Sequence, residues 1–431
     1  MNDVFHYENG ALSVEQVALA TIADAVGTPA YVYSSAGMRT QLRALQDAFS
    51  GQRMTVCYAI KANSNIAVIR TLANEGAGAE IVSGGELQKA LKAGVPADMI
   101  MFAGVAKSRD EMALALDAGI AQFNVESVPE LIALSEVAAA KKAEAPVAVR
   151  INPDVAADTH EKISTGRRED KFGISYERAG EVYAMAASLA GIEPVGVHLH
   201  IGSQIMSLAP FEAAYQRGAD LVRELRAQGI AIRRLDLGGG MGVPYRGDAR
   251  LDVAAYADLV REITAGLDIE LLLEPGRYLV AEAGAMLARV CYIKQGHERP
   301  FAILDAGMND LIRPALYDAY HEILPLKEPT PDTELQPTDV VGPICESSDI
   351  FARGRALPPL AAEDLVAFLG AGAYGAVMAS DYNARPLAAE VLVDGDRFSV
   401  VRPRIEPVAR FADECLPDWL EMPSFECGRA C

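Results

Sequence analysis

Lys61 is the residue whose surroundings point most directly to chemistry. It follows the apolar run TVCYAI and precedes Ala62 and Asn63. Desolvation at the end of a buried strand would lower the pKa of this lysine and favour a nucleophilic amine. A lone lysine at the start of a loop is more often a surface residue, so this interpretation needs support from other parts of the chain.

Three later apolar runs, GVHL, RRLDL and IELLL, also end in segments that could do chemistry. They are followed in turn by His200, Gly202 and Ser203, by the glycines 238–240, and by Glu274, Pro275, Gly276 and Arg277. A glycine-rich loop after a strand can expose backbone N–H groups to a phosphate, and a carboxylate can keep a heterocyclic nitrogen protonated. Each feature alone could be a core histidine, a turn or a surface salt bridge. Together with Lys61 they indicate pyridoxal 5'-phosphate (PLP) as the cofactor.

The elements that must position these residues alternate regularly between about residues 55 and 280. About eight strand-like runs are separated by Ala-rich amphipathic stretches, and the runs are TVCYAI, GAEIV, MIMFAG, AQFNV, VAVRIN, GVHLHI, RRLDL and IELLLE. This number favours an α/β fold of the TIM-like (β/α)8 barrel type, although a doubly wound open sheet would show the same alternation. In such a barrel the carboxyl ends of the strands carry the site.

The alternation of strand-like and helical segments ends at about residue 285. Runs such as PFAILDAG, DLVAFLGAGAYGA and VLVDGDRFSVV read as strands joined by Gly, Pro and Asp turns, and the DG pair is typical of a hairpin. We therefore expect a barrel over 36–280 and a mainly β domain formed by 1–35 and 281–431. The early strand-like segment PAYVYS is expected to join this β domain.

Composition restricts the partners of the protein. The 431 residues carry 59 acidic and 39 basic side chains, a net charge of −20, which argues against nucleic acid as a partner. The 6 cysteines show neither a CxxC pair nor zinc-ligand spacing, so no metal site is expected. The start of the chain is unlike a signal peptide, and no run of about 18 apolar residues suggests a membrane span. These features predict a cytoplasmic protein.

Six motifs in this order carry a family resemblance: YAIKAN, HLHIGSQ, LDLGGGMG, LLLEPGR, CESSD and GAYG. From about residue 30 to 405 the chain resembles the fold-type III PLP-dependent amino-acid decarboxylases. Alanine racemases share a PLP-binding barrel and a β domain but would not be expected to carry EPGR with CESSD. Non-catalytic PLP-binding proteins usually stop after the barrel, whereas this chain continues.

The resemblance implies a role for each matching residue. Lys61 would hold PLP as a Schiff base, His200 would stack on the ring, and Glu274 would pair with the ring nitrogen. The phosphate and its surroundings would involve Ser203, Gly240, Gly276, Arg277 and Tyr374. The substrate would contact Arg277, Arg313, Tyr317, Glu346 and Tyr374. The catalytic set would be Lys61, Cys345, Glu274 and His200, with Cys345 as the first candidate for the general acid and Lys61 as the second.

The resemblance also implies a homodimer, because Cys345 and Glu346 would come from the second subunit. Residues 160–173 resemble a mobile loop over the site. Two positions depart from the pattern: Glu80 stands where aspartate is expected, and Asp381 stands in place of asparagine.

The substrate that the resemblance implies is meso-diaminopimelate, which would lose CO2 to give L-lysine in the last step of lysine biosynthesis. Its second carboxylate calls for a guanidinium such as that of Arg313. Related enzymes of this fold that act on ornithine, arginine or carboxynorspermidine remain alternatives. A non-catalytic PLP-binding protein is the alternative from another class.

Overall fold

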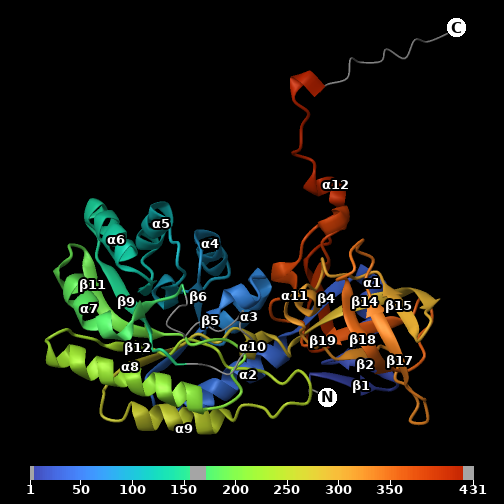
Figure 1. Ribbon diagram of the computed structural model, residues 1–431, viewed down its shortest axis with the longest axis horizontal. Helices are drawn as coiled ribbons and strands as arrows, with labels where there is room; N and C mark the ends of the chain where they lie inside the picture. The colour runs from blue at the N-terminus through green and yellow to red at the C-terminus, as the bar shows by residue number, and fades with distance from the viewer. Residues whose placement is uncertain (1–3, 156–170, 421–431) are drawn as a thin grey trace.

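The structure is a computed structural model that describes residues 4–155 and 171–420. A barrel with surrounding helices forms one end of the molecule, and a mainly β part forms the other (Figure 1). Of the expected mobile loop at 160–173, only Lys171 to Gly173 are described, and the other residues of that loop lie outside the described ranges.

Eight parallel strands close into the barrel, which excludes the open doubly wound sheet. They are β5 (Met54–Ala59), β6 (Gly78–Ile81), β7 (Ile100–Phe102), β8 (Gln122–Val125), β9 (Ala145–Asn152), β11 (Ile192–Leu199), β12 (Arg234–Asp236) and β13 (Glu270–Leu273). The ring is completed where β13 pairs with β5 and β8 pairs with β9. A short strand, β10 (Ile174–Ser175), adds to β9. All eight predicted runs are therefore barrel strands.

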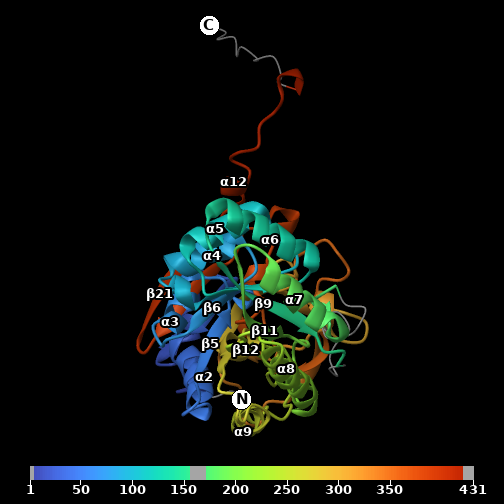
Figure 2. The same ribbon diagram turned by 90° about the vertical axis from the view of Figure 1, so that its left-hand side faces the viewer.

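Helices surround these strands (Figure 2). They are α2 (Ser35–Ala48), α3 (Ile66–Ala73), α4 (Gly84–Lys92), α5 (Arg109–Ala118), α6 (Val128–Lys141), α7 (Ala179–Ser188), α8 (Ala209–Ala227), α9 (Val253–Ile263) and α10 (Arg277–Val280). Three of these helices, α4, α5 and α6, begin after a serine N-cap. The side chains of Ser83, Ser108 and Ser127 each accept a hydrogen bond from a backbone N–H of the first turn. The apolar faces of the helices pack on the strands in one large core.

The β part contains β4 (Ala30–Ser34), β14 (Gly284–Gln295), β15 (Pro300–Leu304), β16 (Ile323–Pro325), β17 (Gln336–Val341), β18 (Ile350–Leu357), β19 (Leu365–Leu369), β20 (Ala389–Asp394) and β21 (Arg397–Arg402). As predicted, the early segment joins it: β4 lies between β14 and β20. The predicted hairpin is β20–β21, whose turn contains Gly395 at φ +66°. A small sheet of β1 (Phe5–Glu8), β2 (Ala11–Val14) and β3 (Val17–Ala18), followed by α1 (Leu19–Val26), packs against this part.

The loop after β19 brings the β part onto the rim of the barrel. A side chain at Gly372 would place its Cβ 1.9 Å from the backbone oxygen of Val280, so only glycine allows this approach. Asn63, two residues after Lys61, donates a hydrogen bond to the Gly372 carbonyl at 3.1 Å. The fold thus brings the GAYG motif to the end of β5. The exact domain boundaries at residues 35 and 280 stay a prediction.

The chain leaves the β part through α12 (Pro407–Arg410) and a 3-10 turn at Asp418–Leu420. Residues 403–420, here called the C-terminal arm, begin against the β part, where Ile405 bridges to Leu387, and then extend away from both parts of the molecule (Figure 1). No helix among the described residues combines the length and apolar character needed to cross a membrane. A cytoplasmic location stays a prediction.

Candidate active site

Lys61 stands in the single 3-10 turn that follows β5, and it forms an ion pair with a residue of the neighbouring strand. Its Nζ atom donates to both carboxylate oxygens of Glu80, at 2.9 and 2.8 Å. Burial lowers the pKa of Lys61, but the charge and hydrogen bonds of Glu80, with smaller contributions from Tyr374 and Glu274, together outweigh burial and raise the pKa overall. Our expectation of a lowered pKa was wrong, because Glu80 supplies a fixed counter-charge that position in the chain does not reveal.

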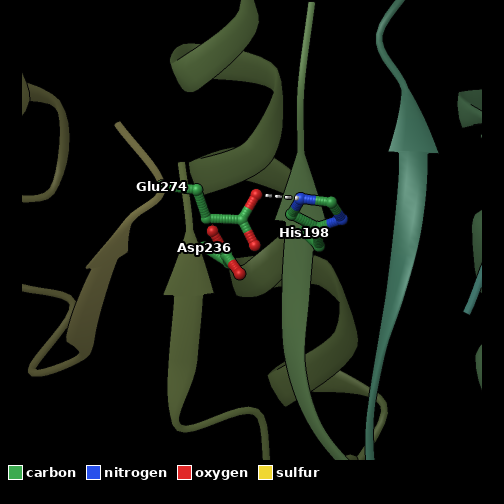
Figure 3. Close-up of side chains that lie close together, drawn as sticks. All are labelled: His198, Asp236 and Glu274. Carbon is green, nitrogen blue, oxygen red and sulfur yellow. Dashed lines mark hydrogen bonds and ion pairs between the residues drawn. The ribbon is translucent and has the colours of Figure 1, made fainter. Parts of the chain in front are cut away.

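Glu274 follows β13 and faces a cluster of polar side chains inside the barrel (Figure 3). Its Oε1 atom accepts a hydrogen bond from Asn124 at 3.0 Å, and its Oε2 atom lies 3.2 Å from Nε2 of His198. Asp236 completes the cluster at the end of β12 and accepts from the same Asn124 nitrogen at 3.2 Å. All four side chains are buried. His198, Asp236 and Glu274 lie close enough together to hold a metal ion, but Asn124 joins the two carboxyls, so we interpret the group as support for Glu274.

His200 stands at the end of β11 and faces the glycine-rich loop. Its Nδ1 atom accepts a hydrogen bond from the Gly239 amide at 3.2 Å. Burial, followed by the charge of Arg150, holds the pKa of His200 well below its ordinary value, so the imidazole is neutral. A neutral, flat ring can stack on a cationic heterocycle without charge repulsion.

The glycine-rich loop is shaped by its close approach to the neighbouring loop. Gly240 has φ +102°, and a Cβ there would lie 2.6 Å from the Gly202 carbonyl oxygen. The residues after it pair with the segment behind His200, since Ile205 and Met241 form a parallel bridge. The two loops therefore form one continuous edge, on which Ser203 and Gly240 lie close together.

Arg277 begins α10 beside this edge. Its guanidinium donates to Ser203 at 3.2 Å and to the hydroxyl of Tyr245 at 3.0 Å, and it stacks on the ring of Tyr374 at 4.9 Å. Tyr374 has φ +56°, an uncommon conformation for a side chain of this size, and its amide donates to the Ala62 carbonyl at 2.7 Å. This strained residue links the β part directly to the turn that carries Lys61.

A second guanidinium lies beside the first. Arg313 is the first residue of α11 (Arg313–Tyr317). Its guanidinium stacks on the ring of Tyr245, the same tyrosine that accepts from Arg277, with 4.9 Å between the guanidinium carbon and the ring centre. Its Nη1 atom lies 3.0 Å from Nε2 of His321. The two arginines together lower the pKa of Tyr245 in spite of its burial. Tyr317 is close enough to contribute to the raised pKa of Arg277.

These two arginines carry positive charge into a nearly closed environment. Arg277 is 8% exposed and Arg313 is 6% exposed. Within the described ranges neither forms an ion pair with a carboxylate, and Nε of Arg277 is buried without a hydrogen-bond partner. Buried charge without a counter-charge is costly, so the arrangement calls for anionic groups from a ligand.

The residues present fit PLP. Lys61 supplies the amine, Glu274 the carboxylate, His200 the neutral ring, and Arg277 an unsatisfied buried donor next to the Ser203 hydroxyl. The remaining donors for a phosphate are the backbone amides of the glycine-rich loop and of Gly276, which packs against Ala59 and Ala62. This set comes from the ends of four barrel strands, and Tyr374, stacked on Arg277, adds one loop of the β part.

Two predicted site residues stay apart from this group within one chain. Cys345 and Glu346 are exposed in the loop between β17 and β18. The Cys345 amide donates to Asn383 at 2.9 Å, and Glu346 likewise bonds to residues of the β part, Ser348 and Tyr382. Among the described residues, no hydrogen bond or ion pair joins either of them to the barrel.

Sequence reasoning missed several members of the site. Asn124 and Asp236 lie within the predicted strands AQFNV and RRLDL, where a polar residue in a buried run was an available signal. Glu80 was noted only because it replaces an expected aspartate. It is also a charged residue within a buried run, GAEIV, and this signal was available for it too. Tyr245 and His321 gave no signal, since both come from loops without a motif.

The fold and the site define the class of the pyridoxal-dependent decarboxylases: residues 35–281 match the family described as "Pyridoxal-dependent decarboxylase, pyridoxal binding domain". A diaminopimelate decarboxylase of Pseudomonas aeruginosa is 49% identical over 414 residues, which cover 96% of this chain and 99% of that protein. The chain belongs to the diaminopimelate decarboxylase family.

Solved structures agree. Diaminopimelate decarboxylase of Helicobacter pylori complexed with L-lysine is 40% identical and superposes with a TM-score of 0.88 over 91% of this chain and 98% of that one. The diaminopimelate decarboxylase of M. jannaschii in co-complex with L-lysine is 37% identical, with a TM-score of 0.92 over 97% of this chain and 99% of that one. The similarity covers both the barrel and the β part.

Proposed function

We propose that this protein removes one carboxyl group of meso-diaminopimelate in a PLP-dependent reaction, giving L-lysine and CO2 as the last step of lysine biosynthesis. The observation that carries the proposal is the pair of buried guanidiniums, Arg277 and Arg313, on either side of Tyr245. One cation beside Ser203 suits the phosphate of the cofactor. The second, Arg313, then suits a carboxylate at the far end of the substrate. The relatives with this name support the same activity.

PLP, when bound to Lys61, supplies a protonated pyridine ring that accepts the electron pair left behind as CO2 departs. Glu274 would keep the ring nitrogen protonated by offering it a carboxylate. His200 is held neutral by burial and covers the ring without adding charge. Arg277, which already contacts Ser203 and Tyr374, would bind the phosphate together with Ser203, and Tyr374 would close the site from the β part.

A proton must then be delivered to the carbon that has lost CO2. We assign this step to the Cys345 thiol, with the Lys61 amine as the second candidate. Cys345 is exposed in a single chain, so its proposed role requires a second subunit that brings it to the barrel rim of the first. Glu346 would arrive with it and offer a counter-charge to the distal ammonium of the substrate.

The exposed surface around Cys345 supports a homodimer. Tyr382 is 45% exposed next to it, and Arg410, in α12 of the C-terminal arm, pairs with Asp381 at 3.0 Å on the same face. The arm that continues from there exposes large apolar side chains, namely Val408 at 65%, Phe411 at 47%, Leu416 at 63%, Trp419 at 83% and Leu420 at 57%. Apolar groups displayed in this way are typical of a protein interface. A two-fold partner over Cys345 would lie beside this arm.

The competing substrates within this fold are ornithine, arginine and carboxynorspermidine. Ornithine and arginine lack a second carboxylate and would leave Arg313 buried without a counter-charge. The test is CO2 release from meso-diaminopimelate, ornithine and carboxynorspermidine side by side, with and without added PLP. We expect turnover of meso-diaminopimelate that depends on PLP. Turnover of ornithine in the absence of turnover of meso-diaminopimelate would refute the proposed substrate.

A further inference from the structure

Asp236 is a buried acid that has no role in the reaction described above. It ends β12 with an exposed fraction of 0%. Its Oδ1 atom accepts from the Gly238 amide at 3.0 Å, and its Oδ2 atom accepts from Asn124 at 3.2 Å. The same Asn124 nitrogen donates to Glu274 at 3.0 Å, so one amide group bridges the two carboxyl groups. Figure 3 shows the Asp236 and Glu274 carboxyls next to one another.

The groups that face this pair do not supply a free positive charge. They are His198 of β11, Cys57 of β5, Glu80 of β6, Lys61 of the turn after β5, Arg150 of β9 and Tyr215 of α8. Lys61 is paired with Glu80, and Arg150 is paired with Glu126 at 3.0 Å. Burial lowers the pKa of His198 to about 4, so its imidazole is neutral at physiological pH.

Two carboxylates so close together in a closed space cannot both be ionised, and one must keep a proton. Burial, followed by the charge of Glu274, raises the pKa of Asp236. Burial also raises the pKa of Glu274, and the charge of Glu80 adds to this. The position of the shared proton is decided by what Glu274 must do, which is to face a cationic ring nitrogen as a carboxylate.

We propose that Asp236 carries this proton and donates it to Glu274 as a hydrogen bond, which makes Asp236 a positioning residue for the carboxylate that faces the cofactor ring. The proposal rests on the proposed function only through the binding of PLP and does not depend on the substrate. Asn124 holds the two carboxyl groups in place, and the protonated Asp236 lets Glu274 bear the single negative charge opposite the ring.

Three variants separate this role from simple packing. Asp236→Asn keeps the size of the side chain and a donor toward Glu274, and loses only the acceptor for Asn124. Asp236→Ala removes both the donor toward Glu274 and the acceptor for Asn124. Asp339→Asn is the matched control, since Asp339 is a buried aspartate (5% exposed) that pairs with Arg299 in the β part. We expect Asp236→Ala to weaken PLP binding about tenfold, while Asp236→Asn and the control stay within about threefold of the native protein.

The decisive measurement uses the cofactor-free protein, so it does not depend on activity. In infrared spectra at neutral pH, the carbonyl band of protonated carboxylic acids should lose intensity in Asp236→Asn and keep it in Asp339→Asn. Burial also raises the pKa of Asp310 to about 7, so the readout is the intensity that the substitution removes and not the complete loss of the band. An unchanged band in Asp236→Asn would place the proton elsewhere and overturn the proposal. An equal loss of PLP binding in Asp236→Asn and Asp236→Ala would also overturn it, because the retained donor would then have no effect.

The pH dependence of unfolding gives an independent readout. A carboxyl whose pKa is raised by folding stabilises the folded state fully below its unfolded pKa, and this stability is lost as pH rises through the folded pKa. Thermal unfolding of the native cofactor-free protein should therefore move to lower temperature from acidic to mildly alkaline pH, and this slope should shrink in Asp236→Asn. An unchanged slope would contradict the proposal. If meso-diaminopimelate is not turned over while these results hold, only the proposed substrate fails.

Discussion

The ammonium of Lys61 and the carboxylate of Glu80 form a two-pronged ion pair across adjacent barrel strands, at 2.9 and 2.8 Å. Glu80 is completely buried, whereas the Lys61 side chain is 36% exposed. The pair fixes the position of the amine and holds it charged until the proton is removed. Since a buried carboxylate without a partner is costly, each charge depends on the other.

Lys61→Ala should abolish both activity and the absorbance band near the visible edge that lysine-bound PLP produces. The physical reason is that no other amine described here stands within the cluster of Glu274, His200 and Arg277. Absorbance spectra of purified protein mixed with PLP test this, and Lys141→Ala, a lysine on the outside of α6, is the control. Retained decarboxylation in Lys61→Ala would disprove the assignment.

Glu80→Gln should shift PLP capture by Lys61 to lower pH. Only the deprotonated amine reacts. Without the Glu80 charge, burial is opposed only by the smaller effects of Tyr374 and Glu274, so the pKa of Lys61 falls and a larger fraction is reactive at a given pH. Rapid mixing of cofactor-free protein with PLP across a pH series should show the midpoint lower by about one unit or more. Glu80→Asp keeps the carboxylate and should shift it much less. A midpoint that stays constant or rises in Glu80→Gln would count against this account.

Glu274→Gln should retain the barrel but lose most activity. A neutral amide cannot hold a positive ring nitrogen, so stabilisation of the developing electron pair is lost, and kcat should fall by about 10²–10³-fold. Steady-state CO2 release measures this. Glu270→Gln is the control on the same strand, because Glu270 pairs with Arg234 at 2.9 Å at the amino-terminal ends of β13 and β12, away from the strand ends that carry the site. A drop of similar size in both variants would mean that the effect is structural.

Arg313→Met should reduce kcat/KM for meso-diaminopimelate on the order of 100-fold, because a buried charge-assisted contact to the distal carboxylate is lost. Any weak turnover of ornithine, which has no distal carboxylate, should change far less. Arg53→Met, at an exposed pair with Asp268, is the control. Equal losses with the two substrates would show that Arg313 does not read the distal carboxylate.

Mixing Lys61→Ala chains with Cys345→Ala chains should restore activity if the site is shared between subunits. Random pairing gives one intact site in each mixed dimer, so roughly a quarter of native activity is the expected limit. Unfolding and refolding the mixture, followed by CO2 assay, measures it. Mixing Cys345→Ala with the doubly substituted Lys61→Ala/Cys345→Ala chain is the control and should restore nothing. Mixed dimers without activity would refute the shared site.

Much of the site was predictable because a parallel barrel has one functional rim. The strand-like runs could be counted, and the closed barrel with eight strands confirms that count. Lys61, His200, Glu274 and Arg277 each follow a run, and parallel strands bring these ends together whatever their separation in the chain. The placement of PAYVYS with the β part was predictable for a similar reason, since a strand outside the barrel needs another sheet.

The protonation state of Lys61 and the side chains that pair with one another in the site were not predictable from the sequence alone. The pKa of Lys61 was expected to be low, yet Glu80 from the next strand raises it. Tyr245 lies between two arginines although it belongs to a loop without any motif. Tyr374 reaches the Ala62 carbonyl only because Gly372 lets the β part approach the barrel closely.

The sequence by itself determined the barrel, its strand ends and the chemistry of the cofactor site, because periodicity reports which segments are buried and parallel topology then gathers their ends. Only the tertiary structure decided which charges are paired inside that rim: Lys61 with Glu80, Asp236 beside Glu274, and the two arginines without any carboxylate in the described chain. The reason is that hydrogen bonds and ion pairs depend on ångström-scale register between elements far apart in sequence, which local patterns do not encode.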